Sequence, residues 1–398
     1  MRNILDILPF DKCCGCGACI CACPTQALSF SQDDFGFIRP QIDNAKCVGC
    51  EKCIRTCPQY NDIESSRPKH VFAALNKNDS VVVNSSSGGI FYALAESVIS
   101  EGGCVFGATL NECFKVKHIC VDRIEDIPLL QKSKYVQSYI GDCYKQALQK
   151  LKEGKKILFS GTPCQIAAMK TIAGGKYAGT LFLVDVVCHG IPSQTFWNDY
   201  VATLSKKIGL LKEYIFCYKR KARNGMNKYT SFTGKRCKKI IKNWPQDSYN
   251  YFFMKAINYQ EACYFCKFAK PQRVSDLTIC DYWRWESYHT NDFPSCSSLS
   301  GICVNSDEGQ MILDKIADKL TLAESSFDNL AAHNGCLLRP TPKPEGREKF
   351  LQEWKSKGYD FIEKNFEKKN RLQILKNRLQ MYVPETIKLW FYRLRHGN

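Results

Sequence analysis

CCGCGACICACP occupies residues 13–24, and CVGCEKCIRTCP occupies residues 47–58. Both stretches contain the pattern C-x₂-C-x₂-C-x₃-C-P, in which three evenly spaced cysteines are followed by a fourth directly before a proline. Three thiolates with this spacing can wrap one side of a four-iron cluster, while the fourth binds the other cluster of a pair. The repeated pattern therefore predicts two [4Fe–4S] sites within a ferredoxin-type domain of residues 1–62.

The pattern also assigns the ligands. We expect the first cluster to be held by Cys13, Cys16, Cys19 and Cys57, and the second by Cys23, Cys47, Cys50 and Cys53. Cys14 and Cys21 are out of register, so we interpret them as non-ligands near a cluster. Replacing either with serine should leave the iron content unchanged, whereas Cys16→Ser should lower it. Zinc is the alternative metal, but zinc ribbons use paired C-x-x-C knuckles and not a triple run followed by C-P.

The bulk composition indicates a large globular chain of 398 residues, with 24 cysteines and a net charge of +17. No apolar run approaches the roughly 18 residues that cross a bilayer, and the start shows no export signal. We therefore expect a cytoplasmic protein whose cysteines are thiols or metal ligands, since disulfides suit small secreted chains.

Strand and helix patterns alternate after a polar linker at residues 61–70. A strand at 71–76 leads to the loop SSSGG at 85–89, which opens a helix ending at Gly102. Strand, turn and helix then recur in KKILFSGTPCQIAAMK (155–170) and GTLFLVDVVCHGIPSQTFWNDY (179–200). This alternation predicts an α/β domain. A Ser/Gly loop at a helix N-terminus can seat a phosphate, although a plain N-cap turn explains the same residues.

Four cysteines of this region suggest a third metal site. Cys164 and Cys188 each follow a predicted parallel strand, at the sheet edge where α/β proteins bind ligands, and Cys263 and Cys266 form a C-x-x-C. We expect them to hold a third [4Fe–4S] cluster, with structural zinc or simple packing as alternatives. Cys280 and Cys296 are possible substitutes.

Six motifs occur in one order along the chain: SSSGGIFYALAESVISEGG, KYVQS, SGTPCQIAAMK, VDVVCHGIPSQTFWNDY, CYFCKF and SDLTICDYW. Together with the cysteine repeats, they make residues 1–320 resemble the coenzyme F420 hydrogenase/dehydrogenase beta-subunit family with a fused ferredoxin-type N-terminus. The resemblance implies an α+β chain: a two-cluster ferredoxin-like domain, an α/β domain with regions 71–150 and 151–335, and a helical tail at 340–398. It also implies bound FAD.

The resemblance further implies roles for individual residues. Ser87, Gly88 and Gly89 would contact the flavin phosphates, and the internal cluster would be held by the four cysteines named above. Four further residues would line the flavin side: Lys134, Tyr135, Gln137 and Ser138. Four basic residues would face an anionic flavin or substrate: Lys219, Lys221, Arg223 and Arg273. The sequence departs from the family at Cys280, where glycine is more common.

Positive charge gathers in residues 205–243 and in the tail. This positive charge suits an anionic small-molecule acceptor. Nucleic-acid binding is not expected, because the sequence contains no recognisable nucleic-acid-binding module. The tail pattern predicts amphipathic helices docked on the protein's own body, with contact to an anionic membrane or a partner as the alternative.

The expected function is that of an iron–sulfur flavoprotein oxidoreductase. A redox partner such as a low-potential carrier would exchange electrons with the clusters, and the flavin would exchange them with an F420-like coenzyme or another substrate. One alternative is a reductase of surface-polysaccharide synthesis acting on a sugar or nucleotide-sugar. Another is a non-catalytic shuttle that passes electrons to a partner. No acid–base residue stands out in the sequence.

Overall fold

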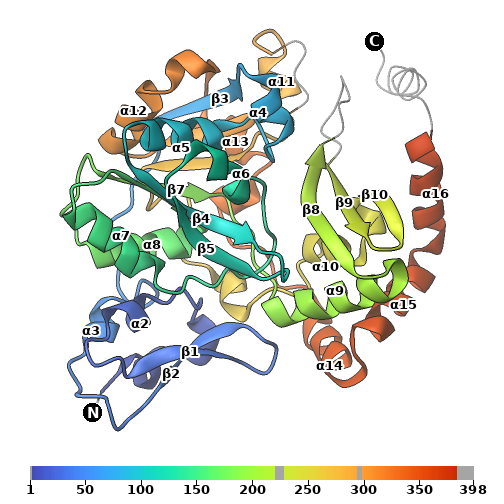
Figure 1. Cartoon of the computed structure of the whole chain (residues 1–398), viewed down its shortest axis with the longest axis horizontal. Coiled ribbons are helices and arrows are strands. Elements are labelled where there is room, and N and C mark those ends of the chain that lie inside the picture. Colours follow the sequence, from blue (N-terminus) through green and yellow to red (C-terminus); the bar gives the residue numbers. More distant parts are fainter. Residues whose placement is uncertain (1, 220–227, 294–297, 383–398) are drawn as a thin grey trace.

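The N-terminal cysteine repeats fold around a short antiparallel hairpin. The computed structural model describes residues 2–219, 228–293 and 298–382. The hairpin joins β1 (Leu28–Gln32) to β2 (Ile38–Ile42), with Leu28 opposite Ile42. The cysteine runs continue into the short helices α2 (Ala18–Ala22) and α3 (Lys52–Arg55), while α1 (Ile4–Ile7) precedes them. Figure 1 shows this unit below the main sheet.

An eight-stranded sheet forms the centre of the molecule, in the order β13-β3-β12-β11-β7-β6-β4-β5. Four of its neighbouring strands, β11, β7, β6 and β4, run parallel, and the remaining pairings are antiparallel. The bounds of the strands are β3 (His70–Asn76), β4 (Cys104–Leu110), β5 (Val116–Val121), β6 (Ile157–Gly161), β7 (Leu181–Val186), β11 (Leu277–Asp281), β12 (Ser300–Val304) and β13 (Leu320–Ser325).

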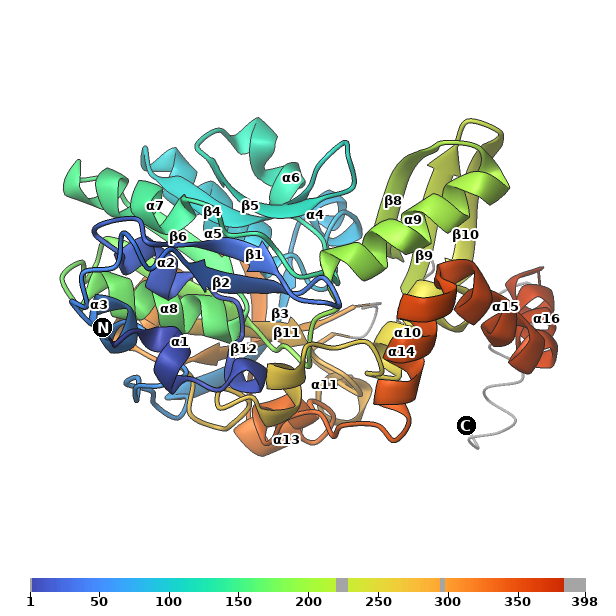
Figure 2. The same cartoon turned by 90° about the horizontal axis from the view of Figure 1, so that it is seen from below.

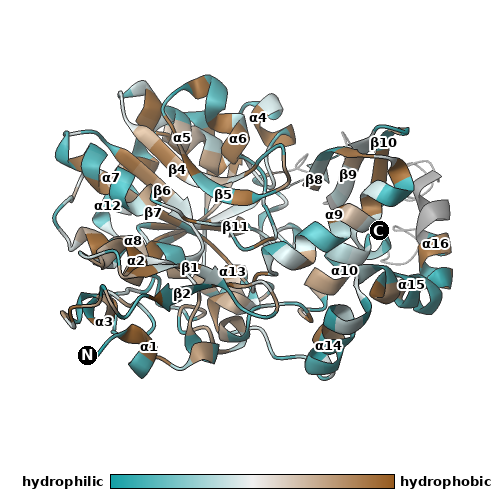
Figure 3. Ribbon diagram, turned by 60° about the horizontal axis from the view of Figure 1, so that its bottom comes forward, coloured by the Kyte–Doolittle hydropathy of each residue, from teal (hydrophilic) through white to brown (hydrophobic). Residues whose placement is uncertain are grey.

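Helices cover both faces of this sheet because its central strands are apolar on both sides. On one face, α5 (Ile90–Ser100) and α12 (Asp307–Asp314) pack on side chains that include Leu158 and Phe182. On the other, α7 (Cys143–Lys152) and α8 (Pro163–Ala173) pack on Phe106 and Phe159. Buried residues of the cysteine-rich unit belong to this second core, so the N-terminal unit is joined to the sheet domain through α8. The central strands β4 and β7 are accordingly largely brown in Figure 3.

A second, three-stranded sheet is inserted between β7 and β11. It consists of β8 (Leu211–Lys219), β9 (Lys228–Gly234) and β10 (Cys237–Asn243), flanked by α9 (Gln194–Ile208) and α10 (Ser248–Met254). Figure 2 shows it at the opposite end of the molecule from the N-terminal unit. The described residues of the basic segment, 205–219 and 228–243, therefore form most of a separate small unit.

The tail docks on this inserted unit. Helices α14 (Arg347–Lys357) and α15 (Tyr359–Lys369) pack against α9: the Trp354 ring lies 4.9 Å from that of Phe196, and its Nε1 donates to Asp199 at 2.8 Å. Helix α16 (Arg371–Tyr382) follows, at the edge of the molecule in Figure 1, and the carbonyl oxygen of its Ile374 accepts from Gln246 Nε2 in the turn after β10 at 3.3 Å. The α+β class with a helical C-terminal end is thus confirmed. Within the part of the chain described, no helix is long and apolar enough to cross a membrane.

Candidate functional site

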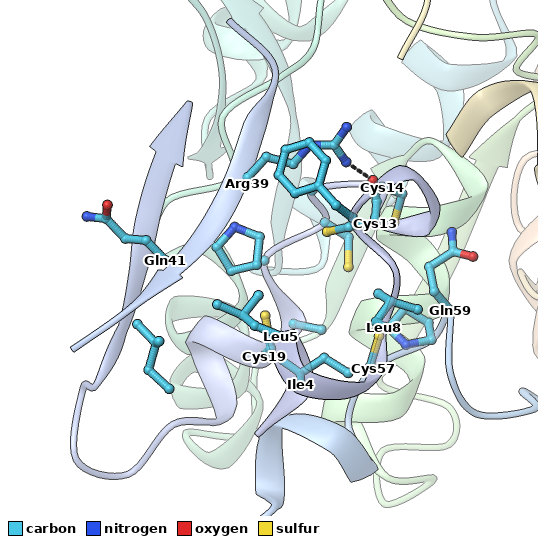
Figure 4. Close-up of a pocket in the computed structure, with 18 residues that line it drawn as sticks. Ile4, Leu5, Leu8, Cys13, Cys14, Cys19, Arg39, Gln41, Cys57 and Gln59 are labelled. Carbon is cyan, nitrogen blue, oxygen red and sulfur yellow. Dashed lines mark hydrogen bonds between the residues drawn. The ribbon is translucent and has the colours of Figure 1, made fainter. Parts of the chain in front are cut away.

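A cavity of about 340 Å³ opens in the N-terminal unit and is lined by one complete predicted ligand set: Cys13, Cys16, Cys19 and Cys57. Cys57 comes from the second cysteine run, so the folded chain brings the two runs together as the crossed pattern requires. Figure 4 shows the labelled thiols of Cys13, Cys19 and Cys57 around this space. Arg39, which lines the same cavity, donates to the carbonyl oxygen of Cys13.

A second, smaller cavity is lined by the other predicted set: Cys23, Cys47, Cys50 and Cys53. Here Cys23 is the residue contributed by the first run. This site lies closer to the surface, because Cys50 is exposed and the neighbouring Val48 is 62% exposed. The backbone amide of Ala27 donates to Cys23 Sγ at 3.2 Å, the kind of bond that tunes a cluster ligand.

Glycine allows the first cysteine loop to approach its surroundings closely. Gly15 has φ of +66°, and a Cβ there would lie 2.3 Å from the carbonyl oxygen of Ile38. The same Cβ would lie 2.7 Å from Nε2 of Gln137 in the sheet domain. Only glycine therefore fits between the hairpin and the sheet domain at this position.

The thiols around the first cavity fit a cationic iron cluster. Burial raises the pKa of Cys57 to about 11, and burial followed by the charges of Cys13 and Cys57 raises the pKa of Cys19 well above its usual value. Closely spaced thiolates become stable only when a metal compensates their charge. Among the described residues, no three His, Cys, Asp or Glu side chains converge as they would on a single ion. The cysteines surround a space instead.

The four internal cysteines come together at the carboxyl edge of the parallel strands. Cys164 lies in the first turn of α8, just after β6, and Cys188 follows β7, while Cys263 and Cys266 lie at a short 3-10 turn. Each interacts electrostatically with another member of the set. Burial raises the pKa of Cys188 to about 12. Cys280 instead lies on β11 beside Cys303, and Cys296 is outside the described residues.

Cys14 occupies a position that its place in the sequence does not reveal. It lines the first cavity, and it interacts electrostatically with Cys164, Cys263 and Cys266 of the internal set. It therefore lies between the first N-terminal set and the internal set. No spacing rule identifies this position, because it depends on how the N-terminal unit packs on α8.

Two of the segments expected near a flavin do meet. In the loop before α5, Ser85 accepts from Gln131 Nε2 at 3.1 Å, and Ser86 accepts from the Ser133 amide at 2.8 Å. Lys219, at the end of β8, donates to the carbonyl oxygens of Ser87 and of Val82. The Ser/Gly loop is thus held between the segment 131–135 and the inserted three-stranded unit.

The glycines of this loop are fixed by close packing. The Gly88 amide donates to Ser300 Oγ at 2.8 Å, and a Cβ on Gly88 would lie 2.5 Å from the carbonyl oxygen of Ala74. Gly89 forms the N-cap of α5 in the left-handed conformation. The loop therefore approaches β3 and β12 at a distance that only glycine allows.

Lys134 is a partly buried lysine near this loop. Its Nζ donates to the carbonyl oxygens of Gln131 at 2.6 Å and of Leu129 at 3.2 Å. Burial, reinforced by the charge of Lys132, lowers the pKa of Lys134 to about 7. The amine of Lys134 therefore gains or loses its proton close to neutral pH, because its surroundings lower its pKa.

Tyr135 connects this region to the internal cysteines. Its hydroxyl lies 3.1 Å from Cys217 Sγ, and its ring centroid lies 4.3 Å from that of Phe253. The Phe253 ring in turn lies 4.9 Å from that of His189, the residue after Cys188. The histidine Nδ1 is 2.7 Å from the hydroxyl of Tyr259, which agrees with a structural role.

Gln137 and Ser138 have other contacts than the expected ones. Gln137 Oε1 accepts from the amide of Ile38 at 2.7 Å, so this side chain holds the N-terminal hairpin. Ser138 Oγ lies 2.7 Å from Nδ1 of His118, whose Nε2 is 3.1 Å from the carbonyl oxygen of Ser160. Burial lowers the pKa of His118 to about 4, so the ring is neutral at physiological pH.

Arg273 also differs from the expectation that it faces an anionic ligand. Its guanidinium is buried and forms an ion pair with Asp185 at 2.5 Å, where both side chains are at most 1% exposed. It also donates to Thr278 Oγ1 and to the carbonyl oxygen of Phe268. Desolvating both charges is tolerated only because they are paired and hydrogen-bonded. Lys221 and Arg223 lie outside the described residues.

Comparisons with known proteins agree with the two halves of this arrangement. Residues 12–61 match the model of the 4Fe-4S dicluster domain, and residues 154–329 match the model of the C terminus of the beta subunit of coenzyme F420 hydrogenase/dehydrogenase. The fold and these matches define an iron–sulfur electron-transfer protein of the oxidoreductase type. In particular, the chain is related to the F420 hydrogenase/dehydrogenase beta-subunit family and carries a dicluster domain at its N-terminus, which confirms the resemblance drawn from the motifs.

Among solved structures, the chain is similar to one from the F420-reducing [NiFe] hydrogenase complex of Methanosarcina barkeri, studied by xenon derivatization. The two are 16% identical with a TM-score of 0.46, over 75% of this chain and 92% of that chain. No curated protein matches the chain.

Proposed function

We propose that the chain is an iron–sulfur flavoprotein oxidoreductase with three [4Fe–4S] clusters in series. The observation that carries this proposal is the arrangement of the three cysteine sets. The second set lies nearest the surface and the first lies deeper, while Cys14, in the wall of the first cavity, interacts electrostatically with the internal set. A one-electron carrier, such as a low-potential redox partner, would exchange electrons at the exposed end.

The proposed flavin site lies where the Ser/Gly loop, the segment 131–135 and Lys219 meet. A bound FAD would supply the exchange between single electrons and electron pairs that clusters cannot perform. The residues would hold it by charge and backbone contacts: Ser87, Gly88 and Gly89 lie before or at the N-terminus of α5, Lys219 brings its amine to this loop, and the Lys134 amine lies at the neighbouring carbonyl of Gln131. Aromatic contacts through Phe253 link Tyr135 to the internal set.

The acceptor is proposed to be anionic. Lys132 interacts electrostatically with Glu213 and Lys239 of the inserted sheet and with Lys134, so lysines outnumber the carboxylate at this place. An F420-like coenzyme fits this charge, and a nucleotide-sugar intermediate of polysaccharide synthesis is the second candidate because it is anionic too. A shuttle that passes electrons to a partner protein would need neither the flavin nor this charge.

Anaerobic purification with simultaneous quantification of iron, sulfide, zinc and flavin tests the proposal. About twelve irons with matching sulfide and one FAD per chain are expected, since a [4Fe–4S] cluster carries four irons. About eight irons without flavin would refute the enzyme and favour the shuttle. Reduction of the purified protein, followed by oxidation with F420 or with nucleotide-sugars in parallel, then separates the two acceptor classes.

A further inference from the structure

Arg39 places a buried positive charge in the wall of the first cavity. The other described residues that line this cavity are apolar residues, cysteines, glycines and the amides Gln41 and Gln59. The Arg39 side chain is 4% exposed, and Figure 4 shows it beside Cys13, to whose carbonyl oxygen it donates. A cluster held by thiolates carries a net negative charge that grows on reduction. The guanidinium therefore lies where it can stabilise the reduced cluster.

The contacts of Arg39 direct this charge toward the cavity. Its Nε donates at 3.2 Å to Oδ2 of Asp33, a residue of the turn between β1 and β2. Oδ1 of Asp33 accepts from the amide of Phe37 at 2.9 Å, so the carboxylate is held at the hairpin. The Arg39 Cζ also lies 4.6 Å from the ring centroid of Phe10. Asp33, unlike Arg39, does not line the cavity, so the ion pair presents its positive end to the cluster site.

The second cavity has a different charge environment. Its lining includes the exposed Arg2 and also Glu51, whose carboxylate opposes that charge. Arg55 donates to the carbonyl oxygen of Cys50 at 2.9 Å, a bond like the one from Arg39, but Arg55 is exposed. Water and ions screen charges at the surface much more than they screen buried charges. The protein therefore stabilises added negative charge less at the second site than at the first.

We propose that the buried charge of Arg39 raises the reduction potential of the first N-terminal cluster above that of the second, so that an electron accepted at the exposed second site moves inward to the first. In this step the second cluster is oxidised and the first is reduced by one electron, without a bond or proton transfer. The inference rests on the two N-terminal clusters of the proposed function, and it requires neither the third cluster nor the flavin.

The test uses the full chain, purified anaerobically, as wild type and as the variants Arg39→Gln, Arg39→Lys, Asp33→Asn and Arg55→Gln. Arg55→Gln is the matched control, because it removes an arginine that also donates to a cysteine carbonyl oxygen but is exposed. Iron and sulfide are counted first, and an EPR-monitored redox titration then measures the potential of each cluster. Cys50→Ser, which changes one ligand of the second set, identifies the signal of the second cluster.

Arg39→Gln should keep the iron content and shift the one-electron equilibrium between the two clusters at least about tenfold away from the first, which corresponds to about 59 mV. Arg39→Lys should retain most of the wild-type potential because it keeps the charge. Asp33→Asn should raise the potential of the first cluster, because it removes the carboxylate that offsets the guanidinium. Arg55→Gln should change either potential much less than Arg39→Gln does.

The proposal is overturned if the first cluster of the wild type has the lower potential, or if Arg39→Gln leaves that potential unchanged. A shift in Arg39→Lys as large as in Arg39→Gln, or a lowered potential in Asp33→Asn, would show that packing and not charge is responsible. If Arg39→Gln loses iron, Arg39→Lys and Asp33→Asn decide by the same criteria. Wild-type protein with fewer than about eight irons would contradict the proposed function itself, since each [4Fe–4S] cluster carries four.

Discussion

Charged side chains that form ion pairs in this protein differ sharply in their exposure to water. Arg273 and Asp185 are buried as an ion pair, while Lys69 and Asp307 form a pair at 2.5 Å whose side chains are 47% and 90% exposed. Water and ions screen the second pair and not the first. Similar contact distances therefore carry different energetic consequences.

Arg273→Met should lower the free energy of unfolding by about 3–5 kcal/mol, because it leaves the Asp185 carboxylate buried without its partner. Lys69→Met is the control and should cost less than about 1 kcal/mol. Urea denaturation monitored by circular dichroism measures both. Adding Asp185→Asn to Arg273→Met should recover part of the loss. Equal effects of the two single variants would contradict this account.

Lys134 should make flavin affinity depend on pH. Its pKa is lowered to about 7, so the amine is charged below that value and neutral above it. If it faces the anionic flavin, the dissociation constant for FAD should increase as the pH rises from about 6 to 8. Fluorescence titration measures it. Lys134→Gln should remove the dependence, whereas Lys176→Gln, at an exposed lysine, should retain it.

Among the elements, the loop before α5 shows most directly how packing limits sequence. Gly88→Ala would place a Cβ 2.5 Å from the carbonyl oxygen of Ala74, so the loop must move. We expect the purified variant to retain its iron and to lose most of its flavin. Gly335→Ala is the control, because a Cβ there meets nothing within 4 Å. Full flavin content in Gly88→Ala would show that the flavin lies elsewhere.

The sequence predicted those elements whose signals are local. The Ser/Gly loop with its helix and the two strand–turn–helix units appear where expected, because alternation and glycines act over a few residues. Cysteine spacing likewise predicted the two N-terminal sets that line separate cavities. The partners of Gln137 and Arg273 could not be predicted, because they come from residues far away in the chain: Ile38 and Asp185.

Across the whole molecule, the three cysteine sets run from the surface toward the sheet. If electrons arrive at the exposed second site, Cys50→Ser should slow reduction by a protein donor at least tenfold. Reduction of the remaining clusters by dithionite with a small mediator should be nearly unchanged, because a mediator can reach them directly. Stopped-flow absorbance measures both. Cys113→Ser, at an exposed cysteine on another surface, is the control. Equal rates of reduction by the protein donor in wild type, Cys50→Ser and Cys113→Ser would show that electrons enter at another site.

The strand order of the central sheet has a consequence for how the protein is made. In the sheet, β3 lies between β12 and β13. It can therefore join the sheet only after residues 300–325, which form these two strands, have been synthesised. The eight N-terminal ligands, in contrast, all lie within the first 57 residues. A ribosome-bound chain therefore presents both N-terminal cluster sites to the iron–sulfur assembly machinery long before Cys263 and Cys266 emerge. If the internal set binds the proposed third cluster, cofactor insertion would follow the same direction as translation, from the first residues to the internal site.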